Sequence, residues 1–179
     1  MVDPLRVTLW FYRGLFVTLA ALLLFIKLLP LGSLAGSWPG PDLLLCLILA
    51  WVVRRPDYLP VLLICAVVLI EDFLLMRPPG LWAGVVILGT EFLRVRVGLT
   101  RELSFAAEWA LVAAVLVAML LAYRLVFVIA FLPQPAFGFA LLQTLWSILC
   151  YPFVVAASRF AFDLRKPATG EVDAYGRRL

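Results

Sequence analysis

Histidine is absent from the 179-residue chain, and cysteine is scarce. Without histidine there is no histidine general base, no Ser-His hydrolase site and no histidine metal ligand. The three cysteines, Cys46, Cys65 and Cys150, are far apart and form no CxxC pair, so neither a zinc site nor a redox motif is indicated. We interpret them as small buried packing residues. P-loop, GxSxG and other catalytic signatures are absent too, so the sequence predicts no catalytic, metal or cofactor residue.

Charged residues are also few: they make up 15% of the chain, whereas 65% of its residues are hydrophobic. A soluble globular domain is about 45–50% apolar, so this composition predicts an all-α integral membrane protein. No polar linker divides the sequence, which predicts one transmembrane domain over residues 1–162 and a cytoplasmic tail over 163–179. The net charge of +4 does not indicate a nucleic-acid partner, because the basic residues sit at the ends of apolar runs, where membrane topology explains them.

Six apolar runs predict a bundle of six transmembrane helices, over residues 9–31, 42–53, 59–76, 81–93, 104–132 and 137–160. The second run is short, since twelve helical residues rise only about 18 Å against a hydrocarbon core of about 30 Å. It either extends back through Trp38 or is partly re-entrant, and Asp42 is well placed to cap it. The first run also fits a signal peptide, but it is long for one and Lys27 interrupts its end, so we expect a retained helix.

The distribution of Lys and Arg predicts the topology. With six spans, three of the 15 basic residues, Lys27, Arg77 and Arg124, lie near or within the outer half of the membrane. The other twelve share the side of the two termini: Arg6, Arg13, Arg54, Arg55, Arg94, Arg96, Arg101, Arg159, Arg165, Lys166, Arg177 and Arg178. Because basic residues are retained on the cytoplasmic side, we expect a multi-pass protein of the bacterial inner membrane with both termini in the cytoplasm.

The segment 59–96 carries acidic residues inside apolar runs. Glu71 and Asp72 lie near the end of the third run, a tight Arg-Pro-Pro-Gly turn follows at 77–80, and the returning run carries Glu91. An acid in a span costs about 2.5–3.5 kcal/mol at the bilayer centre, so these side chains are expected to face protein or water. Adjacent helical positions point about 100° apart, so Glu71 and Asp72 cannot share one environment.

The predicted topology sorts the intramembrane charges into two layers. The outer layer holds Lys27, Glu71, Asp72, Arg77 and Arg124, and the cytoplasmic layer holds Glu91 and Glu108 near Arg94, Arg101 and Arg159. Opposite charges in a layer can pair between helices, and the same residues can also line a proton or ion relay or a polar substrate cavity. We favour pairing, because no ordered chain of titratable groups crosses the middle of the membrane.

Two stretches resemble a known family. WPGPDLLLCLILAWVVRRPDYLP from Trp38 and EDFLLMRPPGLWAGVVILGTEFLR from Glu71 resemble the bacterial rod shape-determining protein MreD. In that family an aspartate near a helix end precedes a turn with Pro and Gly, which Asp72, Pro79 and Gly80 match. A basic turn with a proline precedes that helix, and Arg54, Arg55 and Pro56 match it. Val68 stands where many members have glycine, four residues before the aspartate.

The resemblance implies a non-enzymatic component of the cell-elongation machinery. Its partners would be the bitopic protein MreC, the actin-like MreB, directly or indirectly, and the elongation glycosyltransferase and transpeptidase, all at the lipid bilayer. The family fold resembles the six-helix substrate-binding component of vitamin (energy-coupling factor) transporters. This second likeness supplies an alternative function, a small-molecule substrate-binding component of a transporter. An intramembrane hydrolase or transferase is disfavoured, because no nucleophile–base pair is visible.

The family match also selects Asp72 as the acid that faces the bundle, while Glu71 would reach toward the outer turn. Arg124 is the expected partner of Asp72, because it reaches a similar depth on the fifth run, and Arg77 is the alternative. The structural and interaction candidates are therefore Arg54, Arg55, Pro56, Glu71, Asp72, Pro79, Gly80, Glu91 and Arg124.

Overall fold

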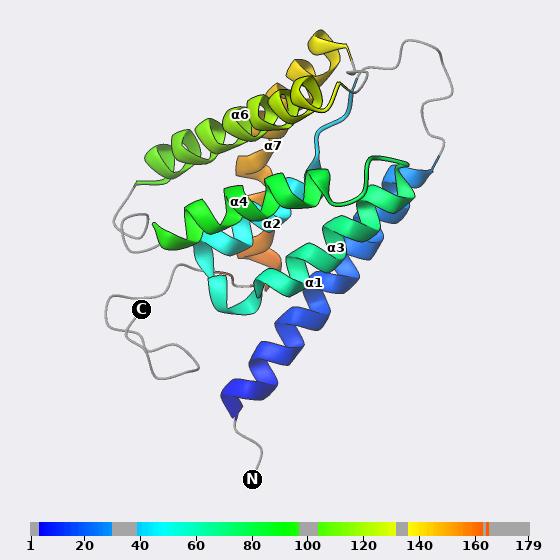
Figure 1. Ribbon diagram of the computed structural model, residues 1–179. Helices are drawn as coiled ribbons and strands as arrows, with labels where there is room; N and C mark the ends of the chain where they lie inside the picture. The colour runs from blue at the N-terminus through cyan, green and yellow to red at the C-terminus, as the bar shows by residue number, and fades with distance from the viewer. Residues whose placement is uncertain (1–3, 30–38, 97–103, 132–135, 163, 165–179) are drawn as a thin grey trace.

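The computed structural model describes residues 4–29, 39–96, 104–131, 136–162 and 164. Within these ranges all regular structure is helical, which confirms the all-α prediction. The elements are α1 (Pro4–Leu28), α2 (Leu43–Arg54), the 3-10 turn η1 (Pro56–Tyr58), α3 (Val61–Leu74), α4 (Leu81–Val95), α6 (Phe105–Ile129) and α7 (Phe137–Phe162) (Figure 1).

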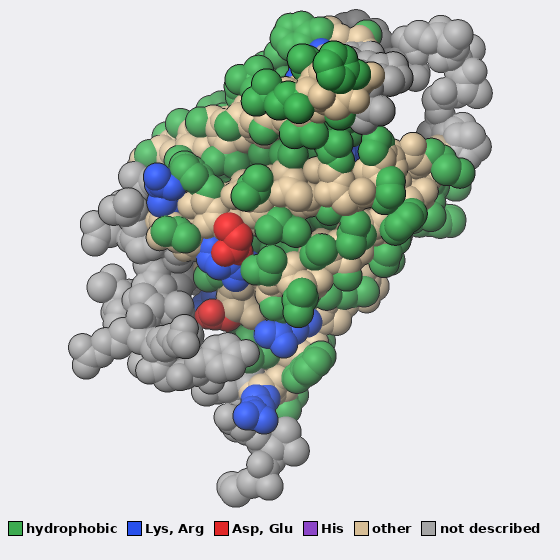
Figure 2. Space-filling model, in the orientation of Figure 1, with side chains coloured by type: hydrophobic (Ala, Val, Ile, Leu, Met, Phe, Trp, Pro, Cys, Tyr) green, Lys and Arg blue, Asp and Glu red, His purple; other side chains and the backbone are tan. Residues whose placement is uncertain are grey.

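Three helices are long and apolar enough to cross a membrane: α1 from Arg6, α6 and α7. Their lengths indicate a membrane protein, because a span needs about 20 apolar residues. The helices α2, α3 and α4 have only 12, 14 and 15 residues, which rise about 18–23 Å. The face drawn in Figure 2 is mostly covered by hydrophobic side chains, as expected for a surface in contact with lipid.

The short helix α2 lies at the centre of the molecule. Every residue from Leu44 to Arg54 is buried, and α2 packs against α1, α4 and α7. A helix that is hydrophobic all round is stable only when protein or lipid covers it on every side. Because the neighbours of α2 are protein, its length does not have to match the thickness of the bilayer.

The start of α2 follows the sequence-based expectation. Asp42 Oδ1 accepts a hydrogen bond from the backbone nitrogen of Leu45 at 3.3 Å, so Asp42 caps the helix as predicted. Residues 39–42 are not helical, which makes the proposed extension wrong over these four residues, and Trp38 lies outside the described part of the chain.

The other helices surround α2 in a continuous order of neighbours, α1, α3, α4, α6 and α7 (Figure 1). The first and last helices of this order, α1 and α7, meet at one end of the bundle. There the Tyr12 hydroxyl donates to the backbone oxygen of Phe162 at 3.1 Å, and the rings of Phe162 and Trp51 lie 6.2 Å apart. This end holds the start of α1 and the end of α7.

The tail predicted over residues 163–179 lies outside the described residues, except for Leu164. Leu164 is buried, and its backbone nitrogen donates to the backbone oxygen of Ser158 at 3.4 Å. Leu164 therefore packs against the end of α7.

Candidate functional site

Asp72, in the last turn of α3, is fully buried and closes the turn to α4. Its Oδ2 accepts hydrogen bonds from the backbone nitrogens of Gly80 at 3.1 Å and Ala83 at 3.4 Å. These N–H groups belong to the first turn of α4, which has no intrahelical acceptors for them and carries partial positive charge. Gly80 has φ +85°, a left-handed conformation that favours glycine. Asp72 is therefore the cap of the helix that follows it.

The expected ion pair between Asp72 and Arg124 is wrong, and so is the alternative with Arg77. In the described part of the chain no guanidinium lies within ion-pair distance of Asp72. The guanidinium carbon of Arg124 lies 4.7 Å from the ring centroid of Phe137, while Arg77 Nη1 lies 3.8 Å from Glu71 Oε1. Instead of a guanidinium, the tight turn places backbone N–H groups next to Asp72, and these stabilise its carboxylate.

Glu71 also faces the bundle, which corrects the expectation that it reaches toward the outer turn. Only 2% of Glu71 is exposed, and its Oε1 accepts from Lys27 Nζ at 2.6 Å. The same ammonium lies 3.3 Å from Asp42 Oδ2. Lys27 therefore joins the end of α1, the start of α2 and the end of α3 through two ion pairs. Glu71 and Asp72 do have separate partners, as their helical positions require.

A second buried charge cluster lies at the opposite end of α2. Arg54 Nη1 is 2.8 Å from Glu108 Oε1, which also accepts from the Tyr151 hydroxyl at 3.0 Å. All three side chains are buried. The sequence placed Arg54 in a basic turn on the predicted cytoplasmic side. The structure shows that its side chain is buried and connects α2 with α6 and α7. The signal for this pair was Glu108, an isolated acid in an apolar run.

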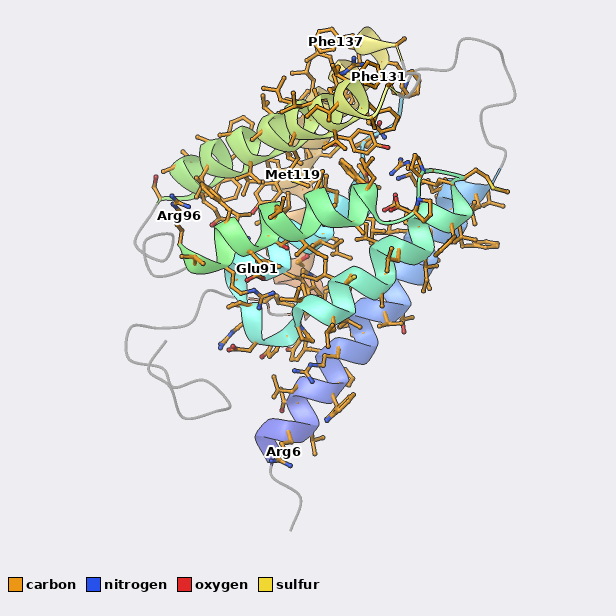
Figure 3. The ribbon with its side chains drawn as sticks, viewed as in Figure 1. Arg6, Glu91, Arg96, Met119, Phe131 and Phe137 are labelled. Carbon is orange, nitrogen blue, oxygen red and sulfur yellow. The ribbon has the colours of Figure 1, made fainter. Side chains whose placement is uncertain are left out.

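The polar turn after α2 is held by Arg94 from α4. Arg94 donates to the backbone oxygens of Pro56 at 3.0 Å and Leu59 at 2.7 Å, and its Nε lies 2.7 Å from Glu91 Oε1. Glu91 therefore orients the side chain that closes this turn. Figure 3 places Glu91 and Arg96 at this end of α4, far from Phe131 and Phe137 at the other end of the molecule.

A cavity of about 440 Å³ lies beside the α3–α4 turn, where the start of α2, the second half of α6 and the first half of α7 meet. Its polar lining includes Arg77, Tyr123, Gln143 and Thr144. Its apolar lining includes Leu45, Met76, Pro78, Trp82, Leu116, Leu120, Phe127, Phe139 and Ala140. Small-molecule sites typically have about 300–1,000 Å³ and a few polar groups in an apolar wall. The sequence indicated almost none of these residues, because they come from distant segments.

A second hollow of about 380 Å³ lies between α4 and α6 and is almost wholly apolar. Gly89 lies in it, and a Cβ added to Gly89 would be 2.8 Å from the sulfur of Met119. The flexible Met119 side chain therefore occupies the space next to Gly89, and a larger residue at position 89 would require this side chain to shift. Among the described residues no group of three or more His, Cys, Asp and Glu side chains could hold a metal ion.

The candidate residues predicted from the sequence thus lie in separate parts of the molecule and do not form one site. Glu71, Asp72, Pro79 and Gly80 meet at one end of α3, whereas Arg54, Arg55, Pro56 and Glu91 lie at the other end of the bundle. Arg124 belongs to the end that holds Phe137. Comparison of the chain with models of protein families, with curated proteins and with solved structures finds no match.

Proposed function

We propose that this protein is a non-enzymatic, MreD-like component of the rod elongation complex in the bacterial inner membrane. It would support rod shape and lateral peptidoglycan synthesis by binding MreC and the cell-wall synthases. One observation carries the proposal: the stretch that resembles MreD, residues 38–96, supplies the central helix α2 and the α3–α4 hairpin. Within it, Asp72 and Gly80, two positions of the family pattern, are in direct contact.

The proposed topology has six membrane crossings with both termini in the cytoplasm. It is supported by the excess of Lys and Arg on one side, twelve of the 15. Most charged side chains visible in Figure 2 also gather toward one end, which holds Arg6, Glu91 and Arg96. A helix as short as α2 can serve as a crossing in this topology, because protein rather than lipid surrounds it and its ends need not reach the two membrane surfaces.

The partner surface in this proposal consists of helix faces within the bilayer together with short turns. Large apolar side chains are exposed on α1 and α7, among them Trp10, Phe11, Phe153 and Phe160. A bitopic partner such as MreC contributes one transmembrane helix, which can lie against such faces. Cross-linking from MreC should therefore map to the helices, and contacts confined to residues 163–179 would contradict this surface.

A second candidate function, the substrate-binding component of a small-molecule transporter, is favoured by the cavity of about 440 Å³. A soluble vitamin-like compound that copurifies with the protein, together with an ATPase partner, would support it. A copurified MreC would support the elongation function instead.

Depletion in the native host, with imaging of cell shape, tests the elongation function. We expect rods to become rounded while the membrane initially stays intact, since lateral wall synthesis would lose its membrane component. Normal rods after full depletion, in a host without a second copy, would rule the proposed function out.

A further inference from the structure

We propose that the cavity beside the α3–α4 turn binds an anionic lipid. The phosphate group would lie at Arg77, Tyr123 and Gln143, and an acyl chain would leave the cavity past Met76 and Phe139. This inference goes beyond the elongation function and does not depend on it, because it concerns only residues of this chain.

Arg77 presents unused hydrogen-bond donors to the cavity. Its nearest carboxylate oxygen, Glu71 Oε1, is 3.8 Å away and already accepts from Lys27 at 2.6 Å. The other contact of the guanidinium is the Trp82 ring, whose centroid lies 5.7 Å away. Among the described residues Arg77 donates no side-chain hydrogen bond, and its planar fork suits two oxygens of a phosphate group.

Two further polar groups line the same space. The Tyr123 hydroxyl and the side-chain amide of Gln143 form no hydrogen bond with any residue that the structure describes, while the Tyr123 ring packs against the rings of Trp82 and Phe127. Both can donate to an oxygen of a ligand. Half-buried polar groups without protein partners are the groups that fix the orientation of a ligand in an apolar site.

The charge that faces the cavity is positive. Asp42 also lines it, but Oδ1 accepts from the backbone nitrogen of Leu45 and Oδ2 is 3.3 Å from Lys27 Nζ. Glu71 is not part of the lining. Arg77 therefore remains the cation available to a ligand among the lining residues, which favours an anionic group over a cationic one.

The mouth of the cavity is apolar. Among the large hydrophobic residues that line the cavity, the most exposed are Met76, at 93%, and Phe139, at 49%. Trp82 and Phe127 continue this apolar surface inward. A small soluble anion such as glycerol 3-phosphate has no apolar group to place against these side chains, whereas a lipid places its acyl chain there and continues into the bilayer. We therefore assign the anion to a lipid headgroup.

Native mass spectrometry of the detergent-purified full-length protein tests the site. Phosphatidylglycerol is the anionic lipid, phosphatidylethanolamine the zwitterionic comparison, and glycerol 3-phosphate the soluble anion. We expect phosphatidylglycerol to bind most tightly. Arg77→Gln should weaken its binding roughly tenfold or more, as loss of a charge-assisted hydrogen bond predicts, and Arg77→Lys should weaken it less.

The matched control is Arg96→Gln, which removes the same charge from a guanidinium that lies 3.8 Å from the Phe92 ring at the other end of the molecule. It should leave lipid binding unchanged. Ala140→Phe fills the cavity without changing a charge, and it should reduce binding while the size-exclusion profile stays that of a folded protein.

Three results would overturn the lipid site. One is equal binding by the Arg77→Gln and Arg96→Gln variants. Another is equal binding of phosphatidylethanolamine and phosphatidylglycerol to the unmodified protein. The third is binding of glycerol 3-phosphate as tight as that of the lipid, which would assign the cavity to a soluble anion. None of these results depends on cell shape, so the site and the elongation function can fail separately.

Discussion

The carboxylate oxygen Oδ2 of Asp72 lies 3.1 Å from the backbone nitrogen of Gly80, across the turn that joins α3 and α4. A side chain from the last turn of one helix thus caps the next helix, and a contact between two residues eight positions apart in the sequence closes the hairpin. The acid is stabilised by backbone N–H groups and a helix dipole rather than by an arginine. This changes what substitutions in the outer charge layer should do.

Replacing Asp72 should loosen the hairpin. Asp72→Ala leaves the N–H groups of Gly80 and Ala83 without their acceptor, and we expect a loss of about 1–3 kcal/mol in the free energy of unfolding. Asp72→Asn keeps an acceptor oxygen and should cost less. Thermal unfolding of the purified variants, compared with protein levels in the cell, measures both. Equal stability of Asp72→Ala and the unmodified protein would contradict the cap.

Gly80→Ala should destabilise the same turn by a different route. The nearest atom to an added Cβ is Leu69 Cδ2 at 3.9 Å, so there is room, but φ of +85° strains any other residue by about 1–2 kcal/mol. Gly84 lies within α4 with no atom within 4 Å of an added Cβ, and Gly84→Ala should be neutral or stabilising. Melting temperatures that rank these two variants in the opposite order would refute the turn geometry.

Lys27→Met should be among the most damaging changes in the outer layer. It leaves the buried Glu71 without its closest cation and removes one partner of Asp42. Breaking a buried ion pair from one side costs about 3–5 kcal/mol. Adding Glu71→Gln to Lys27→Met should recover part of this loss, because the uncompensated charge disappears. Unfolding midpoints of the single and double variants give the coupling, and an additive result would mean that the pair does not act as one unit.

The two neighbouring arginines after α2 should behave differently. Arg54→Leu removes the cation that lies 2.8 Å from the buried Glu108, and we expect a loss of about 3–5 kcal/mol that Glu108→Gln partly restores. Arg55 is only half-buried, whereas Arg54 is buried, so Arg55→Leu should be milder. Expression and thermal unfolding of the three variants check this, and similar losses for Arg54→Leu and Arg55→Leu would contradict the buried pair.

The sequence alone determined the helical, membrane-embedded character of the protein, because it depends on composition and on local hydrogen bonds. The same local physics predicted the Asp42 cap, since a cap and the N–H group it accepts from are three residues apart. It also predicted that Glu71 and Asp72 would have different surroundings, which follows from helix geometry alone.

The tertiary structure decided which partner each buried charge has. Glu71 meets Lys27 across 44 residues and Arg54 meets Glu108 from a different helix, so both contacts depend on how the helices rotate and pack around α2. Several cations lay at suitable depth for Asp72, and depth along a span does not distinguish between them. The turn at Gly80 decides the partner of Asp72, because it places the backbone nitrogens of Gly80 and Ala83 within hydrogen-bond distance of the carboxylate.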